Sequence, residues 1–200
     1  MRVEIMAKTT DMPLSFIGSV AGISTGKDHP KPQRARHCFA FGHMSVFEHV
    51  SVTWRIEGIS RACSHQLVRH RLASYCQQSQ RYTVVGTDSA DWYVTPPHIA
   101  AEDRTAVEFE TAMRQCADHY ASLIKKGMRA DDARYALPEA TKTAIDATMN
   151  LREFMGFYRL RTDNAAQWEI RELAARMRGT LERLHGEWAD FCAMLDDLEG

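Results

Sequence analysis

The sequence lacks several features that would assign the chain to a particular class of protein. Its five cysteines are an odd number, they are widely scattered, and no two of them form a CxxC pair. A disulfide framework and a zinc knuckle are therefore not expected, and a reducing, cytoplasmic environment fits best. No window approaches the roughly 18 apolar residues of a membrane span, and residues 1–6 are too charged for a signal peptide. We expect a cytoplasmic protein with no membrane partner.

A strong net charge is also missing. The formal net charge is -1, and the chain has 44% hydrophobic and 26% charged residues, which is an ordinary globular composition. No general attraction to nucleic acid follows, so any anion-binding site must come from a local concentration of arginine and histidine. The length of 200 residues suits one domain.

Helical and strand periodicities are both present in the sequence. Residues 48–57 alternate between apolar and polar side chains, which predicts a half-buried strand. Its buried face is expected to carry Val50, Val52, Trp54 and Ile56. Ser60 is expected to be the N-cap of a helix that continues to Val68. Residues 102–126 form a long amphipathic pattern that Gly127 ends, and residues 170–198 are apolar at helical spacing.

The other expected elements are shorter. Residues 3–33 are irregular in composition, although three glycines four residues apart, Gly18, Gly22 and Gly26, would let a helix pack closely. The remaining expectations are a short helix at 34–41, short strands at 82–85 and 92–94, a helical turn at 131–136 and a strand at 141–149. Together these elements predict a single α+β domain, with a small and mostly antiparallel sheet packed by long helices.

The segment from residue 66 to residue 82 is the part of the sequence that indicates chemistry. It contains Arg69, Arg71 and Arg81 among serines and glutamines, and the next acidic residue is Asp88. Guanidinium groups this close in sequence repel one another unless an anion lies among them, and their planar geometry matches phosphate oxygens. The segment is therefore predicted to bind an anionic nucleotide.

Other interpretations of these residues stay open. The segment is also compatible with a solvated basic loop, or with an RNA-binding patch in which Tyr75 and Tyr82 stack on bases, although the near-neutral chain disfavours the latter. Surrounding arginines would favour a thiolate at Cys76, so a nucleophilic cysteine is a further possibility. Histidines that suggest a metal site are His37, His43, His49, His65 and His70. They form no HExxH pattern, so we expect no catalytic metal.

The same segment resembles a known enzyme family. Arg69-His70-Arg71, followed after seven residues by Ser79, resembles the diagnostic motif of flavin-dependent thymidylate synthases. The sequence GHMSVFEH at residues 42–49 is similar to the GHxSxxEH segment of that family. Residues 133–138, ARYALP, are similar to its ARxxLP element.

A fourth stretch extends the resemblance toward the C-terminus. NLR at 150–152, LR at 160–161 and AQWE at 166–169 are similar to the NAR, LR and AQWE run of the family. The resemblance spans roughly residues 42–171, whereas residues 1–41 match poorly and are a divergent N-terminal part of the expected domain at 1–200.

The resemblance implies a fold, an activity and a set of partners. It implies an α+β methyltransferase that converts dUMP to dTMP, with methylenetetrahydrofolate as the carbon donor and NADPH-reduced FAD as the hydride source. It also implies a homotetramer with flavin sites built where subunits meet, and it leaves no role for nucleic acid.

The resemblance also implies which residues act. FAD would contact His43, Ser45, Arg69, His70, Arg71, Gln77, Asn150 and Arg152. The nucleotide would be held by Gln66, Arg69, Gln77, Gln78, Ser79, Gln80, Arg81 and Arg134. Arg161 would contact the nucleotide too, and it matches the catalytic arginine that favours ionisation at N3 of the uracil.

Two positions depart from the family pattern. Gln77 stands where relatives often carry Glu, so no proton transfer is assigned to it. Gly156 stands where relatives usually carry Asn or His toward the flavin, which predicts the loss of one cofactor contact and weaker FAD retention.

Overall fold

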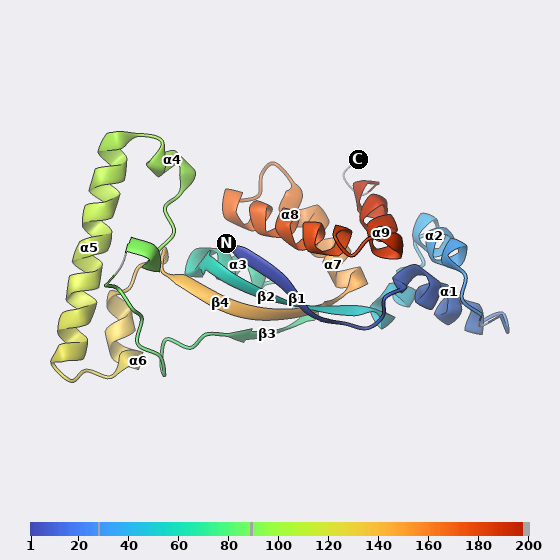
Figure 1. Cartoon of the computed structure of the whole chain (residues 1–200), viewed down its shortest axis with the longest axis horizontal. Helices are drawn as coiled ribbons and strands as arrows, with labels where there is room; N and C mark the ends of the chain where they lie inside the picture. Colours follow the sequence, from blue (N-terminus) through green and yellow to red (C-terminus); the bar gives the residue numbers. More distant parts are fainter. Residues whose placement is uncertain (28, 89, 198–200) are drawn as a thin grey trace. The chain divides into compact units, whose positions relative to one another are not determined.

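Four strands build one sheet in the computed structural model, which describes residues 1–27, 29–88 and 90–197. The strands are β1 (Arg2–Lys8), β2 (Ser51–Ser60), β3 (Ala73–Gln77) and β4 (Lys142–Asn150), in the order β1-β2-β4-β3. The sheet is antiparallel and long helices accompany it (Figure 1), so the α+β expectation is confirmed.

The chain divides into two compact units. The first unit contains Met1–Ile56, Gln66–Cys76 and Asp146–Gly200, and the second contains Glu57–His65 and Gln77–Ile145. Strands β2 and β4 each begin in one unit and end in the other. The single domain expected over residues 1–200 stays a prediction.

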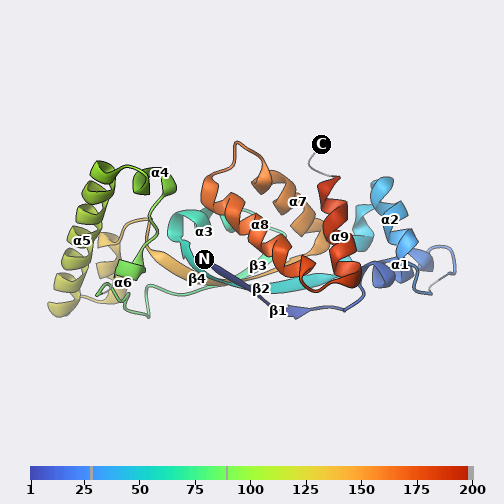
Figure 2. The same cartoon turned by 45° about the horizontal axis from the view of Figure 1, so that its top comes forward.

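The core of the first unit lies between the sheet and three helices. These helices are α7 (Leu151–Thr162), α8 (Trp168–Glu182) and α9 (Gly186–Asp196). Figure 2 shows them on one face of the sheet, and α8 packs against β1. Trp54 of β2 stacks on Phe154 with the ring centroids 5.1 Å apart, and its indole nitrogen donates to Thr180 over 2.9 Å. The alternation predicted for β2 is confirmed, because Val50, Val52, Trp54 and Ile56 are all buried.

The expectation of an irregular segment at residues 3–33 is wrong. Residues 2–8 form β1, and Pro13–Ile23 form α1. Pro13 begins this helix, where its missing N–H would have had no helical partner. The glycine spacing reflects close packing, as expected: a Cβ on Gly18 would lie 2.0 Å from the carbonyl oxygen of Lys31, next to α2 (Pro32–Ala40).

The second unit is built around the long helix α5 (Asp103–Lys125), which is yellow-green in Figure 1. The sequence predicted this helix and its end at Gly127, where φ is +82°. Its apolar side packs through Met113 and Ala117 against Trp92. The other elements of this unit are η2 (Ala90–Trp92), α4 (Pro97–Ala100), α6 (Ala130–Ala133) and η3 (Arg134–Ala136).

Several local predictions can be checked against the structure. The helix predicted after Ser60 is α3 (Arg61–Leu67), and Ser60 Oγ caps it by accepting from the Cys63 amide over 3.0 Å. The strand expected at 82–85 is absent from the described chain, and residues 92–94 contribute only an isolated bridge from Tyr93 to Thr141. The nearby strand is β3, inside the arginine-rich segment itself. Among the described residues, no helix is long and apolar enough to cross a membrane.

Candidate functional site

An open cleft of about 1190 Å³ lies in the first unit along the exposed side of α7. Three arginines line it, Arg152, Arg159 and Arg161. Met44, from the short helix η1 (Met44–His49), and Gly156 add apolar and bare backbone surface. The cleft therefore combines positive charge with apolar surface, which suits an anionic ligand that carries a ring system.

Arg161 is held at this cleft by three hydrogen bonds. Its Nε donates to His70 Nε2 over 3.0 Å, and its Nη atoms donate to Gln66 O over 3.1 Å and to Gln66 Oε1 over 3.5 Å. The structure thus brings together Gln66, His70 and Arg161, three residues that the sequence predicted for one site. All three acceptors are neutral, so the guanidinium keeps its full charge for a ligand.

His70 is a buried, neutral imidazole. Its side chain is 9% exposed, and the ring packs edge-on against Phe157 with the centroids 4.9 Å apart. Burial, together with the charge of Arg161, lowers the pKa of His70 to about 4. Arginine Nε carries a hydrogen and has no lone pair to offer, so His70 Nε2 must accept and Nδ1 must carry the ring proton.

Two polar residues around His70 were not predicted for the site. Glu153 Oε1 lies 3.5 Å from His70 Nδ1, its side chain is 15% exposed, and burial raises its pKa. Tyr75 Oη donates to the carbonyl oxygens of Leu67 and His70 over 2.9 and 3.0 Å, and burial raises its pKa too. One sequence signal pointed to Glu153, because it is the single acidic residue between 150 and 162.

The other predicted flavin-contacting residues of the first unit lie at its surface. His43, Ser45, Arg69 and Arg71 are exposed. The side chains of Arg69 and Arg71 make no hydrogen bond or ion pair with the described part of the chain, so they are available for an anion.

The remaining two predicted residues, Asn150 and Arg152, belong to the start of α7. Asn150 caps this helix, with Oδ1 accepting from the Glu153 amide over 2.9 Å. Arg152 pairs with Glu48 and also lines the cleft. The helix α7 therefore positions two of the predicted site residues, Asn150 at its N-cap and Arg161 in its last turn.

The rest of the arginine-rich segment belongs to the second unit. The Gln77 amide donates to Ser64 Oγ over 2.9 Å and to Thr143 Oγ1 over 3.3 Å, so it is already engaged within the protein. Three predicted nucleotide-binding residues, Gln78, Ser79 and Gln80, line one pocket of about 190 Å³ together with Lys142. The structure therefore gathers these polar groups beside a cation.

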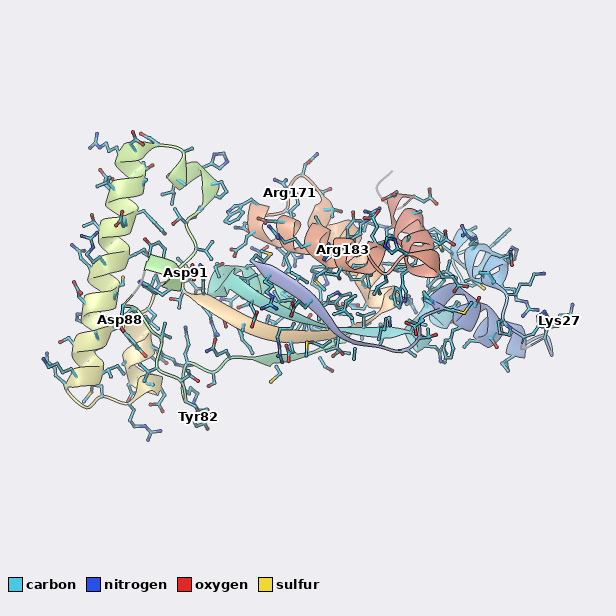
Figure 3. The ribbon with its side chains drawn as sticks, in the orientation of Figure 1. Lys27, Tyr82, Asp88, Asp91, Arg171 and Arg183 are labelled. Atoms are coloured by element: carbon cyan, nitrogen blue, oxygen red, sulfur yellow. The ribbon has the colours of Figure 1, made fainter. Side chains whose placement is uncertain are left out.

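Arg81 and Arg134 each lie beside a tyrosine ring, and Arg134 Nε also donates to the carbonyl oxygen of Asp131 over 3.1 Å. The Arg81 guanidinium lies 5.5 Å from the ring centroid of Tyr82, and the Arg134 guanidinium lies 5.9 Å from that of Tyr135. Figure 3 shows the Tyr82 side chain extending outward from its loop, and it is 83% exposed. Arg134 also lines a second pocket of about 350 Å³, together with Gln80.

The alternative sites can be compared with the same geometry. Cys76 is exposed on β3, and no described side chain acts as a base toward it. Tyr75 uses its hydroxyl in hydrogen bonds and is partly buried, so it is not a free stacking platform. Within the ranges that the structure describes, no group of three or more His, Cys, Asp and Glu side chains is placed to hold a metal ion.

Comparison with known proteins now adds to this geometry. The model of the family described as "Thymidylate synthase complementing protein" matches residues 4–185. The chain belongs to this family. The match includes most of residues 1–41, where the family's sequence motifs are not found.

Individual family members are similar over about two thirds of the chain. The flavin-dependent thymidylate synthase of Geobacter sulfurreducens is 52% identical over 138 residues, which cover 69% of this chain and 59% of that protein. The enzyme of the same name from Pyrococcus furiosus is 46% identical over 138 residues, which cover 68% of this chain and 57% of that protein. The chain therefore spans less than two thirds of the length of these relatives.

Solved structures share the fold of this family member. The flavin-dependent thymidylate synthase ThyX from Helicobacter pylori, complexed with FAD and dUMP, superimposes with a TM-score of 0.80 at 21% identity, and all of both chains is covered. The UMP/dUMP methylase PolB from Streptomyces cacaoi, bound with 5-Br dUMP, gives a TM-score of 0.82 at 22% identity over 96% of this chain and 94% of that chain. At these identities, the likeness establishes the fold.

Proposed function

We propose that the chain catalyses the reductive methylation of dUMP to dTMP, with methylenetetrahydrofolate as the carbon donor and FAD, reduced by NADPH, as the hydride source. The observation that carries the proposal is Arg161, a cation fixed at the mouth of a cleft by neutral acceptors on His70 and Gln66. Membership of the family supports the same activity. The exposed free thiol of Cys76 is compatible with the proposed cytoplasmic location, which is reducing.

Arg161 would act on the uracil ring. Attack from C5 of uracil requires electron density to be pushed into the ring, and loss of the N3 proton provides it by leaving negative charge on N3 and its neighbouring oxygen. A cation that is already oriented stabilises that charge without reorganisation, so it favours the transition state over the bound substrate. Gln66, which holds the guanidinium, would also contact the nucleotide, and Arg69 would add a second cation.

The nucleotide phosphate would be bound by residues that follow β3. Ser79 Oγ accepts from the Arg81 amide over 3.2 Å, so this turn presents a hydroxyl and a guanidinium from positions two residues apart. Such paired donors match phosphate oxygens. The proposed nucleotide contacts in this unit are Gln77, Gln78, Ser79, Gln80, Arg81 and Arg134.

The cofactor would occupy the α7 cleft, whose residues fit it. Arg159 supplies charge for a diphosphate, Arg152 would do so by exchanging Glu48 for the ligand, and Gly156 leaves bare helix backbone for a ring. Residues proposed to hold FAD are His43, Ser45, Arg69, His70, Arg71, Gln77, Asn150 and Arg152. When bound, FAD would supply the hydride, whereas the protein supplies placement and electrostatics.

A homotetramer is part of the proposal. Leu72 is 72% exposed beside Arg71, and Leu160 is 58% exposed on the cleft side of α7. A neighbouring subunit would cover such apolar side chains at a shared site. We propose that each cofactor site is completed in this way.

The proposal is tested with the purified protein, its absorbance spectrum and an assay for dTMP. We expect flavin bands that shift when dUMP is added, and dTMP formation that requires methylenetetrahydrofolate and NADPH. Arg161→Ala should keep the flavin bands and lose turnover, whereas Arg183→Ala, which changes an arginine at the C-terminal end of α8 (Figure 3), should keep both. A protein that takes up neither FAD nor dUMP would refute the proposed function.

A further inference from the structure

We propose that Glu153 is a positioning residue, which acts through the buried His70 to fix the Arg161 guanidinium at the cleft without neutralising it. This inference rests on the proposed function in one respect, the contact of Arg161 with the nucleotide. Glu153 is at none of the motif positions that carry the family resemblance.

The three residues form one row. Glu153, Phe157 and Arg161 are spaced four apart on α7, so they lie along the same face of the helix. His70, which follows α3, lies over this row: its ring meets the edge of Phe157, its Nδ1 is 3.5 Å from Glu153 Oε1, and its Nε2 is 3.0 Å from Arg161 Nε. The imidazole therefore separates the carboxyl group from the guanidinium.

The hydrogen positions follow from the donor at one end. Arg161 Nε–H can only donate, so His70 Nε2 accepts and the ring proton is on Nδ1, the nitrogen that lies 3.5 Å from Glu153 Oε1. A carboxylate beside Nδ1–H favours this tautomer and this ring orientation. Removal of the carboxyl group would let the ring turn, and a turned ring no longer offers Nε2 to Arg161.

The position of the His70 imidazole between the carboxyl group and the guanidinium also decides how much of the Arg161 charge remains for a ligand. A carboxylate in direct contact with Arg161 would cancel the charge that the ligand needs. Instead, the partners of the guanidinium are an imidazole nitrogen, an amide oxygen and a backbone carbonyl oxygen. The charged or titratable groups near His70 are Glu153, Arg161 and Tyr75. Burial, together with the charge of Arg161, lowers the pKa of His70 to about 4, which keeps the imidazole neutral.

A purely structural role for Glu153 has to be separated from this one. Glu153 lies in the first turn of α7, where any carboxylate interacts favourably with the helix dipole. Glu187 provides a matched control, because it is a partly buried carboxylate in the first turn of α9. It accepts from the Ser15 amide over 2.8 Å and does not line the cleft.

The experiment uses the full chain and three variants: Glu153→Met, which keeps the shape but removes the acceptor, Glu153→Gln, which keeps an acceptor oxygen, and Glu187→Gln. Nitrogen-15 NMR reports the tautomer of His70 and the hydrogen exchange of the Arg161 Nε–H, and a titration reports the affinity for dUMP. In Glu153→Met, the turned ring no longer accepts from Arg161 Nε. We therefore expect the exchange of the Arg161 Nε–H to rise and the dUMP affinity to fall by about tenfold each, the effect of losing one charged hydrogen bond. Glu153→Gln should restore both to within about threefold of wild type.

Thermal unfolding completes the comparison. Glu187→Gln should lower the melting temperature without changing the His70 tautomer, the Arg161 exchange or the dUMP affinity. Wild-type exchange and affinity in Glu153→Met would overturn the positioning role, and so would equal losses in Glu187→Gln. A wild-type chain that binds no dUMP would refute the proposed function, whereas the two NMR signals would still report whether Glu153 fixes Arg161.

Discussion

Arg161 and Arg81 are predicted for the same substrate, but their surroundings are opposite. Arg161 makes three hydrogen bonds to His70 and Gln66 in the first unit. Arg81 lies on an exposed turn of the second unit, with its guanidinium over the ring of Tyr82. The partners of Arg161 restrict its conformation before any ligand binds, whereas the exposed Arg81 would be ordered only by a ligand.

Their different surroundings suit the two arginines to different roles. A group that must stabilise developing charge has to be oriented in advance, because reorganisation during the reaction would raise the barrier. A group that contributes affinity for a phosphate can be ordered by the phosphate itself. We therefore propose a reactive role for Arg161 and a binding role for Arg81.

The largest effect should come from replacing Arg161, the arginine that is held by hydrogen bonds. Arg161→Ala should lower kcat by about 10²- to 10³-fold, as expected for loss of a preorganised donor at developing charge. Arg161→Lys should rescue little, since an ammonium cannot reproduce the hydrogen bonds to both His70 and Gln66. Single-turnover dTMP formation measures both, with Arg183→Ala as the control. Full activity in either Arg161 variant would contradict the comparison.

The next effect is a pH dependence of the free energy of unfolding, which comes from His70, the neighbour of Arg161. The pKa of His70 is about 4 in the folded chain and about 6.5 when unfolded, so the unfolded state binds the proton first. The stabilisation is fully present above pH 6.5 and is lost as pH falls toward 4, by up to about 3 kcal/mol. The raised pKa of Glu153 acts in the opposite sense and offsets part of the loss.

Urea unfolding across this pH window measures the effect. His70→Gln should have a flatter pH dependence than wild type, because the replaced side chain does not titrate. An equal slope in the two proteins would mean that other groups cause the acid sensitivity and that His70 is not held neutral by the fold.

A smaller effect is expected in the exposed region. Ser79→Ala should weaken dUMP binding by about three- to tenfold, the range of one neutral hydrogen bond, and should leave the melting temperature unchanged because the residue lies on a surface turn. Ser74→Ala, an exposed serine of β3, is the matched control. Calorimetric titration with dUMP gives the comparison, and equal affinities for the two variants would remove Ser79 from the phosphate site.

The smallest effect concerns the cleft wall. Gly156 is in the middle of α7, and a Cβ there would meet no atom within 4 Å beyond its own stretch of helix. Gly156→Ala should therefore stabilise the protein by about 0.5–1 kcal/mol, the helix-propensity difference. Thermal unfolding tests this expectation, and a titration with FAD shows whether the added methyl group obstructs the cofactor. Destabilisation would mean that the wall is already closely packed.

Local patterns in the sequence determined much of the fold. The alternation in β2, the cap at Ser60 and the helical stripe of α5 are confirmed, because side-chain burial with a period of 2 or 3.6 residues requires no knowledge of distant contacts. The expectation of an irregular N-terminus is wrong; it relied on the prolines and glycines of residues 3–33, although the spacing of Gly18 was expected to suit a packed helix. In the structure, Pro13 begins a helix and Gly18 lets that helix pack against a neighbouring backbone.

The motifs likewise predicted a set of site residues, but the tertiary structure decided which of them contact one another. Arg161 and His70 were both predicted from short stretches, yet they are 91 residues apart and meet only when α7 packs beside the turn after α3. Glu153 carries no motif position in the prediction, and its contact with His70 exists only in three dimensions. The sequence by itself specifies which groups are present, whereas burial and hydrogen-bond geometry set which of them are neutral, charged or fixed, since these properties depend on neighbours that local sequence does not contain.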